Sequence, residues 1–177
     1  MKKIFFIFTI ALLFSCSDSV EIPTSNVSTS DIEGVWNLTS LTSEVNTKVT
    51  SLDSSYENES ITTHGEEYNF SFNFSQNPNV YTTEGTLNVV TETVINDETE
   101  TTKHEANTVQ GLSTGEWKVS GKNLIFKKGD NGAIQSKFTI EWFSKNKMVL
   151  KRNLSENKVK NNSFIVVTGA STIILER

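Results

Sequence analysis

Cysteine is nearly absent from this chain of 177 residues, since Cys16 is the only one. A single cysteine cannot form a disulfide within the chain, so the fold must be stabilised by its core alone. Histidine is almost as scarce. His64 and His104 lie among polar residues with no carboxylate at metal-ligand spacing, so we expect neither a metal site nor a cofactor.

Clusters of basic residues are also missing. The chain has 16 Lys and Arg against 21 Asp and Glu, a formal net charge of −5. This excess of acid argues against nucleic acid or anionic lipid head groups as partners. The sequence contains no Gly-x-Ser-x-Gly motif, no phosphate-binding loop and no nucleophile beside a recognisable base. We therefore predict that the protein is not an enzyme and assign no catalytic residue.

No apolar run is long enough to cross a bilayer as a helix. The longest one extends from Ile4 to Phe14 and is interrupted only by Thr9. Basic residues 2–3 precede it, which is typical of a signal peptide. The closing Leu13-Phe14-Ser15-Cys16 resembles the lipobox of bacterial lipoproteins. That resemblance implies a signal peptide over residues 1–15, lipidation of Cys16 and a lipid-anchored protein.

The composition of the segment after Cys16 is typical of a flexible tether. Residues 17–30 are rich in Ser and Thr and have no apolar period, so we predict a flexible tether over 16–30 and a single folded domain over 31–177. Ser17 follows the cysteine, where an aspartate would resemble an inner-membrane retention signal. We therefore expect the outer membrane, on either its periplasmic or its cell-surface face.

Alternation of apolar and polar residues is the main pattern of the domain. It is cleanest from Glu67 to Ser75, where four rings share one face, and it recurs from Ile134 to Phe143. No stretch shows a helical period. The rings expected to point inward are Tyr68, Phe70, Phe72, Phe74, Trp117, Phe126, Phe138 and Trp142.

Turn residues separate these runs at hairpin spacing. They occur at Asn96-Asp97, 120–123, 129–132 and 144–147. The acidic stretch from Glu92 to Glu105 surrounds the first of these turns and predicts a solvated edge hairpin. Consecutive antiparallel strands must hide their edges, which closure into a barrel does best. We therefore predict an all-β, antiparallel up-and-down barrel of eight to ten strands, with a sandwich as the alternative.

A family resemblance begins at Gly34-Val35-Trp36, at the start of the first predicted strand. Gly-x-Trp in this position resembles the first lipocalin signature. The run Gly115–Gly121, and Phe138-Thr139-Ile140 followed by Met148-Val149-Leu150, resemble the lipocalin-like domains of Bacteroidota lipoproteins. The Thr-Asp-Tyr signature of typical lipocalins is absent, so the resemblance is to the broader lipocalin-like group and extends loosely over residues 31–177.

The resemblance implies a structural role for three residues. Trp36 would close the bottom of the barrel, Arg177 from the final strand would lie across its ring, and Gly34 would belong to the same signature. It also implies a lid over the barrel mouth in the span Ser43 to Glu66, which has no clear period. The other interpretation of this span is a long exposed loop with an extra edge strand around Thr47 to Leu52.

The aromatic face suggests what the barrel does. Its rings either fill the interior as a packed core or leave space for one small ligand. We expect a non-enzymatic, lipid-anchored envelope protein that binds a small apolar or amphipathic molecule. The alternative is a structural or assembly factor that binds another envelope protein or a glycan. The residues expected to contact a ligand are Tyr68, Phe70, Phe72, Trp117, Phe138 and Trp142.

Overall fold

A computed structural model describes residues 23–51, 56–128, 133–160 and 162–177. Cys16, the predicted signal peptide and the turn predicted at 129–132 lie outside these residues. The described elements, in chain order, are η1 (Thr24–Asn26), α1 (Thr29–Ile32), β1 (Gly34–Ser51), β2 (Tyr56–Ser75), β3 (Val80–Ile95), β4 (Glu98–Ala106), β5 (Thr114–Ser120), β6 (Asn123–Lys128), β7 (Ala133–Phe143), β8 (Lys147–Lys160) and β9 (Ser163–Glu176).

The strands form one antiparallel sheet that closes on itself. Their order is β2-β1-β9-β8-β7-β6-β5-β3-β4, and β2 also pairs with β3. Eight strands therefore make a closed up-and-down barrel, and β4 lies outside the ring as an extra strand. The predicted all-β barrel is confirmed, and the sandwich alternative is excluded.

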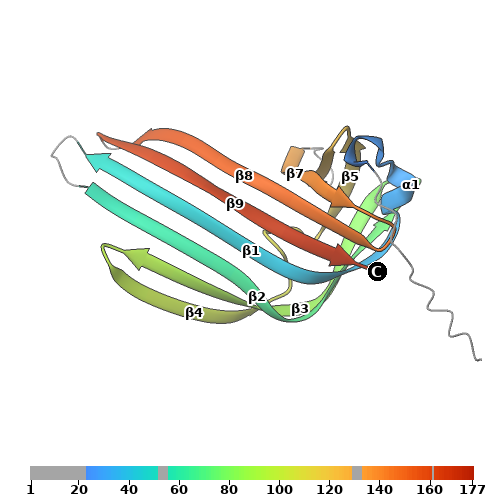
Figure 1. Cartoon of the computed structure of the whole chain (residues 1–177), viewed down its shortest axis with the longest axis horizontal. Helices are drawn as coiled ribbons and strands as arrows, with labels where there is room; N and C mark the ends of the chain where they lie inside the picture. Colours follow the sequence, from blue (N-terminus) through green and yellow to red (C-terminus); the bar gives the residue numbers. More distant parts are fainter. Residues whose placement is uncertain (1–22, 52–55, 129–132, 161) are drawn as a thin grey trace, which may run out of the picture.

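Unequal strand lengths give the molecule two different ends (Figure 1). β1 and β2 have 18 and 20 residues, whereas β5 and β6 have 7 and 6. β3 changes partner along its length, because residues 80–82 pair with β5 and residues 87–95 pair with β4. The part enclosed by all eight strands is the closed end. Beyond it, β8, β9, β1, β2, β3 and β4 continue as the open sheet, made of residues 152–160, 163–171, 43–51, 56–65, 87–95 and 98–106.

Aromatic rings fill the closed end. Phe126 is at the centre, with its ring centroid 4.9 Å from that of Tyr81 and 5.9 Å from that of Phe138. Phe74 packs edge-on against Trp117 at 5.3 Å. Each of these side chains is at most 2% exposed, and ring contacts of this kind add to the stabilisation that burial already gives. The interior of the closed end is therefore a packed core.

A β-bulge in β7 changes which rings face inward. Ile140 pairs with Leu150 and Trp142 with Val149, so Glu141 is an extra residue. One extra residue shifts the alternation to the opposite face. Phe143 is consequently fully buried, whereas Trp142 is only partly buried. The prediction that Trp142 points into the barrel is wrong for this reason.

Residues 43–66 belong to the β1–β2 hairpin. Val45 pairs with Ile61, and the pairing continues to Thr50 opposite Tyr56. β1 also pairs with β9 over the same span. The described residues therefore form neither a lid nor a long loop. The strand expected from Thr47 is present as far as Ser51, but it continues β1 and is not an edge strand. Residues 47–51 lie in a central strand, and their weak period reflects two faces that are both partly exposed.

The β3–β4 hairpin turns at Asn96-Asp97. Both residues have positive φ, at 49° and 69°, which is the conformation of a two-residue hairpin turn of type I′. Every residue of β4 except Ala106 is exposed, so the predicted solvated edge hairpin is confirmed. Lys103 Nζ donates to Glu66 Oε2 at 2.8 Å, which ties β4 to β2 and lowers the pKa of Glu66.

The start of the described chain caps the closed end (Figure 1). Val27 and Ile32 are 6% and 0% exposed. The ordered fold therefore begins before Asp31, and the predicted tether over 16–30 ends several residues too late. None of the helical segments in the described residues is long and apolar enough to span a membrane.

Trp36 and Arg177 fasten this cap. Trp36 Nε1 donates to the Ile32 carbonyl oxygen at 2.7 Å. The Arg177 guanidinium lies over the Trp36 ring, with Cζ 4.1 Å from the ring centroid, which is cation–π geometry. Its Nη2 also donates to the carbonyl oxygens of Asp31 and Ile32 at 3.1 and 3.2 Å. Gly34 lies against the same guanidinium.

Candidate functional site

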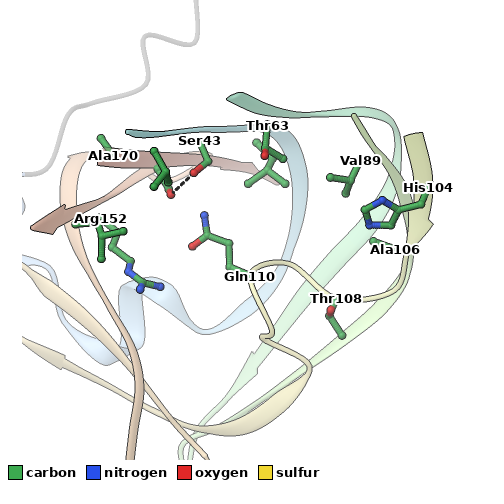
Figure 2. A pocket seen from close by; sticks show the side chains of 13 residues that line it. Ser43, Thr63, Val89, His104, Ala106, Thr108, Gln110, Arg152 and Ala170 are labelled. Carbon is green, nitrogen blue, oxygen red and sulfur yellow. Dashed lines mark hydrogen bonds between the residues drawn. The ribbon is translucent and has the colours of Figure 1, made fainter. Parts of the chain in front are cut away.

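A pocket of about 380 Å³ lies where the closed end gives way to the open sheet (Figure 2). Strands β1, β8 and β9 supply one side of it, β2, β3 and β4 supply the other, and the β4–β5 connection contributes Thr108 and Gln110. The lining residues are Leu41, Ser43, Val45, Thr63, Val89, His104, Ala106, Thr108, Gln110, Arg152, Leu154, Ala170 and Ser171.

Sheet register aligns three hydroxyl residues in one row across the pocket. Ser171 pairs with Ser43, and Ser43 pairs with Thr63. The two serine hydroxyls are hydrogen-bonded to each other at 2.8 Å. Arg152 extends the same row, because it pairs with Ser171 on the other side. Ser171, Ser43 and Thr63 are called the hydroxyl row below.

Apolar residues flank the hydroxyl row on both sides. Leu41 and Val89 lie toward the closed end, and Leu41 is 4% exposed because it belongs to the core. Leu154, Val45 and Ile61 follow in the next row of the open sheet, where Gly169 stands between the first two. The pocket therefore changes from apolar to polar and back to apolar along the strands.

Arg152 brings a positive charge to this polar band. Its Nη1 donates to Ser136 Oγ at 3.1 Å, and Ser136 is itself 4% exposed. The arginine is partly buried. Within the described part of the chain, no carboxylate lies within salt-bridge distance of its guanidinium. An arginine in this state can bind a planar anionic group through two parallel hydrogen bonds.

Gln110 enters the pocket from a tight turn. Gln110 and Gly111 have φ of 51° and 78°, and Leu112 N donates to the Val109 carbonyl oxygen at 2.9 Å. Val109 and Leu112 are fully buried and anchor the turn in the core. Gln135 Nε2 holds it from the other side by donating to the Gly111 carbonyl oxygen at 2.7 Å. These contacts therefore fix the backbone from which the Gln110 side chain extends.

The side-chain oxygen of Gln110 is buried and has no hydrogen-bond partner. A buried polar atom without a partner costs about 1–3 kcal/mol. In the view of Figure 2, the Gln110 amide lies between the Ser43 hydroxyl and the Arg152 guanidinium. The amide oxygen is therefore an unused acceptor close to other polar groups in that view.

None of the six residues predicted to contact a ligand lines this pocket. Phe70, Phe72, Trp117 and Phe138 are at most 3% exposed and form the packed core. The Tyr68 hydroxyl accepts a hydrogen bond from Leu41 N at 2.9 Å. Tyr68 and Phe70 border a different hollow, next to Glu84 and Gly85.

The sequence analysis did not predict Arg152 or Gln110 as pocket residues, and the two differ in whether the sequence carries a signal for them. Arg152 carries a signal, because the alternation of Met148, Leu150 and Leu154 places it on the inward face of β8. A cation at an inward position is unusual unless it has a partner or a function. Gln110 carries no such signal, because the sequence does not show that its connection turns back into the barrel.

The pocket combines polar groups with apolar surface. It offers one guanidinium, one amide, four hydroxyls and apolar surface on either side. His104 lies on the exposed β4 side of the pocket. Within the described residues, no group of three or more His, Cys, Asp or Glu side chains could hold a metal ion.

Comparison with known proteins adds no relative to this description. No family model, no curated protein and no solved structure matches the chain.

Proposed function

We propose that this protein is a lipid-anchored, non-enzymatic envelope lipoprotein with a lipocalin-like barrel that binds one small amphipathic ligand in the pocket between its two ends. The pocket's volume and lining carry the proposal. Ligand sites are typically hollows of roughly 300–1,000 Å³ with mainly apolar walls and a few fixed polar groups. A pocket of about 380 Å³ with Leu41, Val45, Val89 and Leu154 around Arg152 and Gln110 fits that description.

Two observations support the lipocalin-like part of the proposal. The chain begins its first strand with Gly34-Val35-Trp36, and the last residue, Arg177, lies across the Trp36 ring. The barrel is closed by consecutive antiparallel neighbours except for the inserted β4. These features fit a lipocalin-like barrel in which the closed end is packed and the ligand lies nearer the mouth.

The lipid anchor rests on the sequence around Cys16. Cys16→Ser in the full chain should abolish incorporation of a clickable palmitate analogue and leave an unprocessed precursor. Fractionation of cells carrying the unmutated chain should find it in the outer membrane. Undiminished labelling of the Cys16→Ser protein would refute the anchor without bearing on the pocket.

Ligand binding can be tested on a soluble form that begins at Ser17 and so retains every described residue. We expect it to bind dodecanol or dodecanoate with one-to-one stoichiometry in native mass spectrometry and titration calorimetry. Leu154→Trp should fill the pocket and abolish binding. Val159→Trp is the matched control, because Val159 is 78% exposed in the same strand. Failure of the unmutated protein to bind either compound would refute the proposal.

One observation favours the assembly role as a second candidate. In the described strands, two strand edges have no neighbour: the side of β4 that faces away from β3, and the side of β8 residues 152–160 that faces away from β9. Unpaired edges can accept a strand from another protein. Affinity capture from solubilised membranes would favour this role if it recovered one protein partner in stoichiometric amount, and if that capture were lost when Thr101→Pro interrupted β4.

A further inference from the structure

We propose that the pocket selects a single-chain amphiphile with an acidic head group, whose carboxylate is bound by Arg152 beside the Gln110 amide. This inference rests on the proposed binding function and names the chemical class of its ligand. The head group would lie along the hydroxyl row, and the hydrocarbon chain would lie on the apolar residues that follow it in the open sheet.

The charge on Arg152 is available to a ligand. Its hydrogen bond to Ser136 Oγ uses one edge of the guanidinium. The nearest acidic residue on the same face of β8 is Glu156, which is bound by Lys158. That hydrogen bond is the main reason why the pKa of Glu156 is lowered, and Arg152 contributes least. The remaining donors of Arg152 can therefore meet an anion that comes from outside the chain.

The groups around Arg152 suit a carboxylate. The bonded pair Ser43 and Ser171 has a second hydroxyl hydrogen to donate, because only one of the two is used between them. The Gln110 side chain extends from a turn whose backbone Gln135 holds. Its Nε2 can donate to a carboxylate, whereas its unpartnered Oε1 can only accept a hydrogen bond and does not bind the carboxylate. A carboxylate at Arg152 would accept from the guanidinium, a serine hydroxyl and the amide N–H₂ together.

The apolar residues limit the rest of the ligand. Leu154, Val45 and Ile61 lie in the row beyond the head group, and Gly169 leaves the strip between Leu154 and Val45 without a side chain. A hydrocarbon chain can lie over that glycine. The volume of about 380 Å³ is small for a ligand pocket, so it suits one short chain and not a two-chain lipid.

The test compares dodecanoate with dodecanol, which have chains of equal length and differ in head-group charge at neutral pH. Titration calorimetry on the soluble form should show that Arg152→Gln weakens dodecanoate binding about tenfold or more, as expected for a hydrogen bond to a charged group. Dodecanol binding should change less than about twofold. Lys151→Gln is the matched control, because it removes the same charge from the adjacent residue on the opposite face of β8, and it should leave both affinities within about twofold.

The outcomes separate this inference from the proposed function. Binding of both compounds with no specific loss of dodecanoate in Arg152→Gln would overturn the acidic ligand and leave the binding function standing. Equal weakening of both compounds would mean that Arg152 acts only through the fold, which also overturns the inference. No binding of either compound to the unmutated protein would overturn both. A selective loss of dodecanoate, restored in part by Arg152→Lys, would support the inference.

Discussion

Gln110 has both a strained backbone conformation and a buried side-chain oxygen without a hydrogen-bond partner. Its φ of 51° is in the left-handed region, which costs a residue other than glycine about 1–2 kcal/mol. Its buried side-chain oxygen, Oε1, adds the cost of an unpaired polar atom. Such states persist where the surroundings fix them, and they occur often at ligand sites. Here the buried residues Val109 and Leu112 provide the fixation.

Gln110→Gly should therefore stabilise the protein and weaken its ligand binding. We expect the free energy of unfolding to rise by about 1 kcal/mol, because glycine adopts positive φ without strain and carries no polar atom to bury. Dodecanoate affinity should fall. Gly111→Ala in the same turn is the control with the opposite sign, since its φ is 78°. A loss of stability in Gln110→Gly, measured by urea unfolding, would contradict this account of the turn.

Tyr81 makes the stability of the fold depend on pH above about 10. Burial raises the pKa of its phenol to about 12, against about 10 in an unfolded chain. The unfolded state therefore loses the phenolic proton first, so the stabilisation is fully present below about pH 10 and is lost as the pH rises toward 12. The loss is on the order of 2 kcal/mol. Urea unfolding at pH 8 and 11 should show a steeper decline than in Tyr81→Phe, and equal declines would contradict the assignment.

At the scale of the element, β2 shows how strictly the two faces of a strand differ. Phe72 is 1% exposed, whereas its neighbour Asn73 is exposed. Phe72→Asp should unfold the domain, because loss of the ring costs about 3–5 kcal/mol and the buried charge costs more. A whole domain is stable by only about 5–15 kcal/mol. Asn73→Asp should be nearly neutral, and thermal melts followed by circular dichroism would separate the two.

The alternation from Phe70 to Phe74 in β2 could be predicted from the sequence because this part of the strand has one fully buried face. The same method failed at Trp142, because a β-bulge at Glu141 reverses the alternation and the neighbouring sequence has no signal that predicts the bulge. It failed also over residues 43–66, where both faces of the strands are partly exposed and polar residues occur on each. Strict alternation of apolar and polar residues thus indicates that one face of a strand is buried. A strand whose two faces are equally exposed lacks this alternation and resembles a loop in sequence.

The pocket shows the same limit. The inward position of Arg152 on β8 follows from the alternation of its neighbours, so this half of the site could have been predicted from the sequence. The approach of Gln110 depends on the connection from β4 folding back across the barrel, held by Gln135 from a distant strand. A contact of that kind depends on tertiary structure. The rings that looked most suited to a ligand were instead needed to fill the closed end.

At the scale of the whole molecule, the two ends should differ in local stability. The closed end contains the packed rings, whereas β4 pairs with β3 alone among the described strands and is exposed along almost its whole length. Backbone amides exchange with solvent through local opening where buried contacts are few. Hydrogen exchange should therefore be slow at Tyr81 and fast in residues 98–106. Equal protection of β4 and β5 would contradict this division.

If Cys16 carries the proposed lipid, the position of the cap over Trp36 would set which end of the molecule faces the membrane. The described chain begins at Pro23, and α1, whose Ile32 carbonyl oxygen accepts a hydrogen bond from Trp36, lies at the end opposite the open sheet (Figure 1). A lipid on Cys16 would hold that end toward the membrane and turn the open sheet toward the aqueous phase. A ligand would then arrive through water and not by lateral diffusion from the bilayer. That route favours a molecule that dissolves as a monomer, and a charged head group on one short chain provides such solubility.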